Sequence, residues 1–144
     1  MLNTMKNFIL IGMLATMSLA PAYADDDDMK KSQEDVKAIS DYEALKKYSL
    51  TGAKDRQIQL NQVMRTRILD DRTIVFFMRN NKAYVNRMKY DCAGLKHEDR
   101  FAYDSFNGLL TSMDKIWVID DFGRQNTVCG LEEFVEFQRT PKKD

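Results

Sequence analysis

The chain has few of the residues that build metal and nucleophilic sites. Its 144 residues include one histidine, two cysteines and two prolines. A metal site uses several cysteine or histidine ligands at short, regular spacing, and neither cysteine has a second one close by. Nucleophilic catalysis needs a nucleophile beside a base, and no motif of that kind is found. The sequence therefore predicts no catalytic residue, no metal and no cofactor.

The chain also lacks an excess of charge of either sign. It carries 22 lysines and arginines against 22 aspartates and glutamates. Contacts to phosphate dominate the affinity of proteins for nucleic acids, so a protein that binds them needs a basic face. The balanced charge predicts no nucleic-acid partner, although it leaves room for a local charged patch.

Long apolar runs are scarce, and one lies near the beginning of the chain. Residues 8–20 are almost wholly apolar, with Lys6 before them and Pro21 after them. A helix rises about 1.5 Å per residue, so this run spans roughly 20 Å, less than a bilayer core of about 30 Å. Residues 22–24, Ala-Tyr-Ala, place small side chains at the positions that signal peptidase recognises.

We therefore expect residues 1–24 to be a cleavable signal peptide. The mature protein is then periplasmic or secreted, after cleavage near Ala24, and has no stable membrane anchor. The alternative is a retained anchor, but four aspartates follow at once and no basic stop-transfer segment is present.

The two cysteines, Cys92 and Cys129, lie 37 residues apart in the part that would be exported. An even number of cysteines in an oxidising compartment predicts a disulfide. Closing a loop of this length stabilises a fold by roughly 4 kcal/mol in the chain-entropy account. Two free thiols, or a pair of metal ligands, are the alternatives.

Three segments flank the predicted core. Residues 25–31 begin with the four aspartates and predict a disordered acidic leader. Residues 32–50 predict a helix, with Ser32 as its N-cap and Gly52 closing it. The apolar face of that helix is thin, so we expect it to pack loosely or to project. Residues 139–144 form a charged tail.

From Ile58 onward the hydrophobic pattern changes to a period of two, which is typical of strands. The expected strands are 64–68, 73–78, 82–88, 100–106, 115–120, 127–129 and 134–137. Turn signals separate them, among them Asp70-Asp71 and Asn80-Asn81. We expect a mainly β fold over residues 56–138: a small antiparallel meander or barrel of about six or seven short strands, preceded by one N-terminal α-helix.

Four arginines fall on the first predicted hairpin: Arg65, Arg67, Arg72 and Arg79. Alternation places Arg65 and Arg67 on one face, opposite Ile68. Guanidinium groups bind carboxylate, phosphate and sulfate through paired hydrogen bonds, so these arginines are a candidate ligand face. The alternative is a solvent face whose charges discourage pairing between strand edges.

Two polar residues fall where the pattern predicts an interior. Asn86 and Asp114 are a possible buried polar network, since a buried polar group needs hydrogen-bond partners. The alternative is a buried ligand site. His97 is interpreted as a solvated loop residue, since general-base catalysis would require a nucleophile and an orienting carboxylate close to it.

An ordered series of short motifs resembles a known family. The motifs are Leu-Asp-Asp-Arg-Thr at 69–73, Cys-x-Gly-Leu at 92–95, Asp-x-Ile-x-Val at 114–118 and Cys-Gly-Leu-x-x-Phe at 129–134. Together they are similar to a family of small exported proteobacterial proteins classed as a domain of unknown function. The resemblance implies a signal-bearing β domain that contains cysteine, with no assigned activity. Members of that family often carry two further cysteines, at places here taken by Gln57 and Thr111.

These features predict a non-enzymatic domain of the cell envelope that acts by binding or as a structural accessory. Its partner would be an envelope protein or a small ligand. The alternative is a small-molecule or glycan-binding module that uses the barrel mouth or the arginine-rich strand face. An envelope hydrolase is a third class, and it would need His97 in its active site.

Intact-mass spectrometry of the exported protein should show Asp25 as its first residue, because signal peptidase cleaves after small residues such as Ala24. The same protein expressed without export gives the control mass. Exported material that retains residues 1–24 would contradict the signal peptide and favour the membrane anchor.

Overall fold

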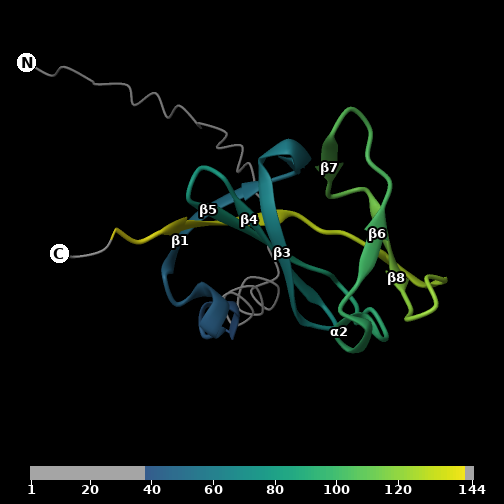
Figure 1. Ribbon diagram of the computed structural model, residues 1–144. Helices are drawn as coiled ribbons and strands as arrows, with labels where there is room; N and C mark the ends of the chain where they lie inside the picture. The colour runs from purple at the N-terminus through teal and green to yellow at the C-terminus, as the bar shows by residue number, and fades with distance from the viewer. Residues whose placement is uncertain (1–37, 142–144) are drawn as a thin grey trace, which may run out of the picture.

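The computed structural model describes residues 38–141, which form antiparallel sheets joined by short connections (Figure 1). The strands are β1 (Tyr48–Asp55), β2 (Gln57–Gln59), β3 (Val63–Asp70), β4 (Thr73–Met78), β5 (Lys82–Arg87), β6 (Phe101–Tyr103), β7 (Leu109–Thr111), β8 (Lys115–Ile119), β9 (Gln125–Gly130) and β10 (Phe134–Arg139). Two 3-10 turns, η1 (Glu43–Leu45) and η2 (Leu60–Gln62), and the short helix α2 (Leu95–Glu98) lie between them.

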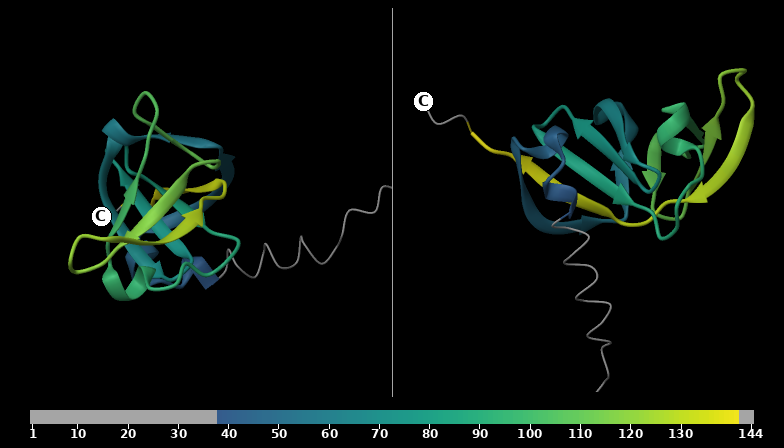
Figure 2. Two further views of the ribbon diagram at one scale, coloured as in Figure 1. Left: turned by 90° about the vertical axis from the view of Figure 1, so that its right-hand side faces the viewer. Right: turned by 90° about the horizontal axis from the view of Figure 1, so that it is seen from below.

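Three sheets are present in this part of the chain. The largest has five strands in the order β1-β10-β5-β4-β3, a second pairs β2 with β7, and a third has the order β6-β8-β9. Seen from below, the hairpin of β8 and β9 projects away from the five-stranded sheet (Figure 2). The mainly β, antiparallel fold class is therefore confirmed.

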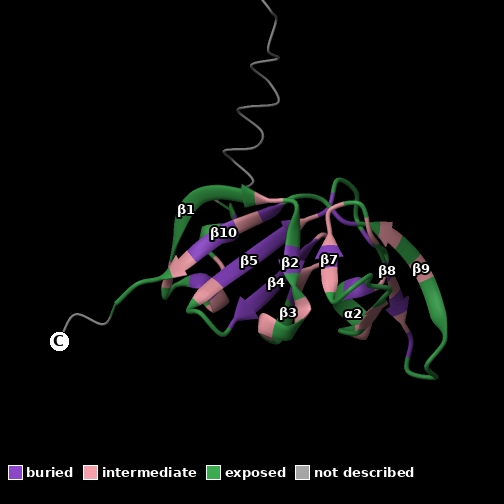
Figure 3. Ribbon diagram, turned by 90° about the horizontal axis from the view of Figure 1, so that it is seen from above, coloured by how far each residue is buried: buried purple, intermediate pink, exposed green. Residues whose placement is uncertain are grey.

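The two central strands of the large sheet are buried on both faces. All six residues of β4 are buried, as are the four middle residues of β5 (Figure 3). Side chains of a strand alternate between the faces, so consecutive residues of β4 enter two different cores. Ile74 and Phe76 enter one, whereas Val75 and Phe77 enter the other.

The larger core lies between this sheet and the rest of the molecule. It includes Phe76 and Phe134, whose rings meet edge to face at 5.8 Å between centroids. Leu110 of β7, Ile116 of β8 and Leu95 of α2 close it from the other side. This core joins the three sheets into one domain.

The smaller core lies on the opposite face and is covered by the beginning of the described chain. Ile39 and Leu45 are each only 1% exposed and pack with Val75, Phe77 and Phe137. The expectation that this segment packs loosely or projects was therefore wrong. The two buried side chains of this segment are sufficient to join the core, because β4, β5 and β10 supply its other buried residues.

The predicted helix over 32–50 differs from the structure at its end. Residues 38–40 are helical and η1 follows, but β1 begins at Tyr48, whose register partner on β10 is Arg139. Gly52 lies inside β1 at φ 81°, where the register with β10 shifts. Gly52, expected to close a helix, serves a bulge in the strand instead. Ser32, the leader at 25–31 and the signal peptide at 1–24 lie outside the described residues.

The strands agree with the predicted ones at most positions, and the β4 boundaries are the predicted ones. Asn81 lies in the β4–β5 turn at φ 62°, as the hairpin requires. Three strands were not predicted: β1, β2 and β7. Sheet pairing therefore extends from Tyr48 to Arg139, beyond the expected bounds of 56–138 at both ends.

The described strands do not close into a barrel, which corrects that part of the prediction. β3 ends the five-stranded sheet and β6 ends the three-stranded one, without pairing to each other. Four exposed residues in a row, Met64 to Arg67, occupy β3 before the buried Ile68. Within residues 38–141 no helix has the length and apolar character needed to cross a membrane.

The predicted disulfide between Cys92 and Cys129 is confirmed, with 5.8 Å between the two Cα atoms. Cys92 follows β5 of the five-stranded sheet and is fully buried, whereas Cys129 lies in β9 of the three-stranded sheet. The bond therefore joins the two sheets covalently at the wall of the larger core.

Reduction of the disulfide should lower the free energy of unfolding by roughly 4 kcal/mol, because the unfolded chain regains the entropy of a 37-residue loop. Thermal unfolding with and without dithiothreitol measures this effect. The double variant with Cys92→Ser and Cys129→Ser is the control, and its melting temperature should not respond to the reductant. An unchanged melt of the wild-type protein in dithiothreitol would contradict a stabilising bond.

Candidate functional site: an arginine-lined cleft between two sheet edges

A cleft of about 480 Å³ lies between β3 and β6. Residues 65–68 of β3 form one wall, and residues 99–101 with Tyr103 form the other. Figure 1 shows β6 beside β3, at the boundary between the large sheet and the smaller one. The volume is within the range of small-ligand sites, about 300–1,000 Å³.

Three arginines, Arg65, Arg67 and Arg100, are among the residues that line the cleft, together with one acidic residue, Asp99. Arg65 lies with its guanidinium carbon 4.4 Å from the centroid of the Phe77 ring, which holds its side chain on the face of the smaller core. Arg100 forms an ion pair with Asp121 of the β8–β9 turn. The residues that line the cleft therefore carry a net positive charge, although Asp121 offsets the charge of Arg100.

The remaining lining adds an aromatic wall. Phe101 packs against the larger core, 6.4 Å from Phe76 between ring centroids. Its other neighbour is Tyr103, at 6.0 Å, whose side chain reaches the surface. Cationic groups beside aromatic surface suit a ligand that carries negative charge together with some apolar area.

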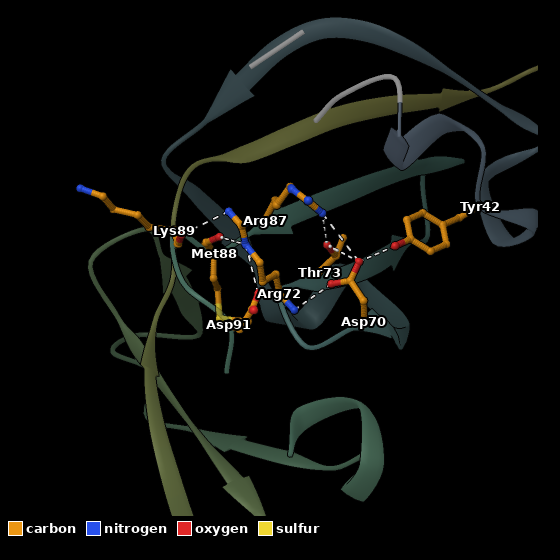
Figure 4. A network of polar contacts seen from close by, with 8 residues as sticks. All are labelled: Tyr42, Asp70, Arg72, Thr73, Arg87, Met88, Lys89 and Asp91. Carbon is orange, nitrogen blue, oxygen red and sulfur yellow. Dashed lines mark hydrogen bonds and ion pairs between the residues drawn. The ribbon is translucent and has the colours of Figure 1, made fainter. Parts of the chain in front are cut away.

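The structure brings together two of the four predicted arginines and separates the others. Arg72 turns away and donates from Nε to the carbonyl oxygen of Met88, at 3.1 Å, with an ion pair to Asp91 at 3.6 Å (Figure 4). Arg79 is exposed in the β4–β5 turn, outside the cleft. Arg100 was not predicted, although its position directly before the aromatic strand β6 was a signal.

A second polar network lies at the turn between β3 and β4, with Asp70 at its centre (Figure 4). Its carboxylate accepts hydrogen bonds from the Tyr42 hydroxyl, from the Arg72 amide at 2.7 Å and from the Thr73 hydroxyl at 3.1 Å. Arg87 forms an ion pair with it at 3.7 Å. Burial works to raise the pKa of Asp70, but these partners outweigh it and hold the pKa below its ordinary value.

The Tyr42 bond connects this turn to the segment that covers the smaller core. The hydrogen bond to the Asp70 carboxylate is the main cause that raises the pKa of the Tyr42 phenol, and burial adds to it. Since Tyr42 lies between Ile39 and Leu45, one polar contact and two buried side chains fix the same segment. The network is therefore structural, and it lies at the end of the strand that carries Arg65 and Arg67.

The two predicted polar residues both hold the connection between β9 and β10. Asn86 is fully buried, donates to the carbonyl of Glu132 and accepts from the Glu132 amide at 3.1 Å. Asp114 is half-buried; its carbonyl accepts from the Leu131 amide at 3.0 Å, and its carboxylate accepts from the Thr111 amide at 2.6 Å. Their hydrogen bonds hold two adjacent residues, Leu131 and Glu132, where the chain passes from the three-stranded sheet to the five-stranded sheet.

A buried carboxylate that the sequence reading missed lies on β10. Glu136 accepts from the Lys82 ammonium at 2.6 Å, from the Tyr84 hydroxyl at 3.1 Å and from the Thr51 hydroxyl at 3.2 Å. The bond from Lys82 is the main cause that holds the pKa of Glu136 below its usual range, against the effect of burial. Burial, with carboxylates nearby, raises the pKa of Tyr84. Alternation from Phe134 indicated that Glu136 faces inward.

Other candidate groups do not form a site. His97 is exposed on α2, rather than in a loop as expected. Asp120 organises the β8–β9 turn by accepting from the amides of Phe122 and Arg124, at 2.9 and 2.8 Å. Among residues 38–141, no group of three or more histidine, cysteine or acidic side chains is placed to hold a metal ion.

Asp70→Asn should lower the free energy of unfolding at neutral pH by about 1–3 kcal/mol, because charge-assisted hydrogen bonds are lost. In the wild-type protein the lowered pKa of Asp70 stabilises the fold above pH 3.8, the ordinary value, and this stability is lost as the pH falls through the folded pKa. The free energy of unfolding of the variant should therefore fall less than that of the wild-type protein below about pH 4. Urea unfolding at pH 3 and pH 7 measures both effects.

Asp91→Asn is the matched control, since Asp91 is exposed and has a long ion pair to Arg72. It should leave stability within about 0.5 kcal/mol of wild type. An equal effect of the two substitutions would contradict the special role of Asp70.

In comparisons with known proteins, no family model matches the chain, and neither a curated protein nor a solved structure matches it. The resemblance to exported domains of unknown function therefore stays a prediction. The candidate site stands on the geometry of this chain: an open cleft lined by three arginines, between β3 and β6, which are end strands of their sheets within residues 38–141.

Proposed function

We propose that this protein is an exported, non-enzymatic binding domain that holds an anionic ligand in the cleft between β3 and β6. The observation that carries the proposal is the convergence of Arg65, Arg67 and Arg100 on one concave site. Two of these residues come from β3 and the third from the far wall, so arginines flank the cleft on both sides. Export rests on the predicted signal peptide and is supported by the disulfide.

The arginines favour carboxylate, phosphate and sulfate groups. A guanidinium group offers paired donors that match these oxyanions, and hydrogen bonds to charged groups contribute about 1.5–3 kcal/mol each. Arg65 is held by the Phe77 ring and Arg100 by Asp121, so both are positioned before a ligand arrives. A positioned side chain loses less conformational entropy on binding.

A structural accessory of the envelope is the second candidate. Large apolar side chains are exposed in three successive connections: Phe106 at 82%, Met113 at 91% and Phe122 at 83%. Such exposed apolar side chains are available for contacts with another protein. Since these residues lie outside the cleft, this second role is compatible with ligand binding.

Arg67→Glu should weaken binding of an anionic probe about 10-fold or more, because it removes a charge-assisted contact and adds a repulsive charge. Suitable probes are a sulfated oligosaccharide and a short polyglutamate, titrated by calorimetry at low and physiological salt. Affinity for the wild-type protein should fall as salt rises.

Arg79→Glu makes the same change of charge at an exposed turn outside the cleft and is the matched control. It should leave affinity within about 3-fold of wild type, since only long-range charge is altered. Equal weakening by the two variants, with unchanged melting temperatures, would show that the probe responds to net charge and would overturn the proposed site.

A further inference from the structure

One wall of the cleft is a strand edge, and the other is formed by Asp99 and Arg100 of the α2–β6 connection together with Phe101 and Tyr103 of β6. β3 is the last strand of the five-stranded sheet, and β6 is the last strand of the three-stranded sheet. Residues 65–68 line the cleft consecutively, and so do residues 99–101. A wall made of consecutive residues brings the backbone itself to the cleft. An unpaired edge presents a row of N–H and C=O groups that can pair with another strand.

The contact from α2 shows how the backbone of β3 is oriented. The Lys96 ammonium donates to the carbonyl oxygen of Ile68 at 3.0 Å, from a helix at the end of the cleft. The carbonyl of Ile68 therefore faces away from β4. Backbone groups alternate in direction along a strand, and the register with β4 is regular from Arg65 to Ile68. The N–H and C=O groups of Thr66 accordingly face the cleft as well.

The side chains on this edge differ between the two faces of the strand. Arg65 and Arg67 share the face of Phe77 and Val75, their register partners on β4. Ile68 points to the opposite face, toward the larger core, against which Phe101 packs. A strand laid along this edge would have alternate side chains beside the arginines and the others beside apolar surface.

We propose that the cleft binds an extended segment of a partner protein that adds to β3 as a further strand. Charge complementarity defines the segment: it carries acidic residues at every second position, opposite Arg65 and Arg67, and apolar or β-branched residues between them. Four residues of β3 span about 13 Å, so the segment is short. This inference rests on the proposed function, because it uses the same cleft and the same arginines.

A labelled eight-residue peptide that alternates glutamate and valine, blocked at both ends, tests the inference with the purified exported protein. Fluorescence anisotropy measures its affinity. An isomer with all glutamates in one half has the same charge and composition, and it should bind at least 10-fold more weakly. Arg67→Glu should weaken the alternating peptide at least 10-fold, and Arg79→Glu should change its affinity less than 3-fold.

Two N-methylated peptides separate strand addition from plain charge attraction. In a strand, the amides of the glutamates all face one side and those of the valines face the other. One peptide carries a methyl group on a central glutamate amide, and the other carries it on a central valine amide. We therefore expect one of the two to lose affinity at least 10-fold and the other less than 3-fold. Equal affinity of both peptides, with Arg67→Glu still weakening them, would overturn strand addition and leave the anion site standing.

The remaining outcomes identify other occupants. Binding of the sulfated oligosaccharide but of neither peptide isomer would overturn the peptide partner while leaving the proposed function intact. Binding of the peptide only after Asp25, Asp26, Asp27 and Asp28 are changed to asparagine would assign the cleft to the acidic run of the chain itself. A dimer in sedimentation that Arg67→Glu dissociates would assign the edge to a second copy. Either of the last two results would overturn a partner protein as the occupant.

Discussion

The structure depends on the burial of β4 and β5 on both faces. A sheet whose central strands are buried on both sides needs a cover on each, and this chain uses different parts of itself for the two. Strands β7 and β8 with α2 cover one face, and the segment around Ile39 and Leu45 covers the other. At about 25 cal/mol for each Å² of apolar surface removed from water, covering both faces is the main favourable contribution. The disulfide and the Tyr42–Asp70 bond then hold each cover in place.

The elements that cover the two faces of the sheet leave the outer edge of β3 exposed. β4 is paired on both sides, whereas β3 has one open side and carries exposed charge at its centre. Charged side chains on an edge strand discourage aggregation. The same arginines attract a strand of opposite charge, so protection and recognition are compatible. The far wall of the cleft favours a role in ligand binding. Arg100 and Tyr103 lie across the cleft from β3, and protection against aggregation alone would not require them there.

The sequence predicted the parts of the fold that are local. β4 is a dense run of β-branched and aromatic residues between two turn signals, and its limits followed from composition. β1 was missed because it has no buried side chain: six of its eight residues are exposed and the two at its ends are half-buried, so it carries no alternating pattern. It forms because β10 offers an edge for pairing. Arg65 and Arg67 were found by alternation within one strand. Arg100 joins them only through the arrangement of two sheets, which no local pattern contains. Glu136 was missed for a similar reason, since its partners come from three strands.

The predicted resemblance to exported domains places two further cysteines where this chain has Gln57 and Thr111. The structure places these two residues directly opposite each other, as register partners on β2 and β7. Opposed residues of an antiparallel pair have Cα atoms about 4.5–5.5 Å apart, within the range that a disulfide spans. A pair of cysteines at these two positions would fasten β2 to β7, the two-stranded sheet that here is held by backbone pairing and by Ile58 and Leu110 in the larger core.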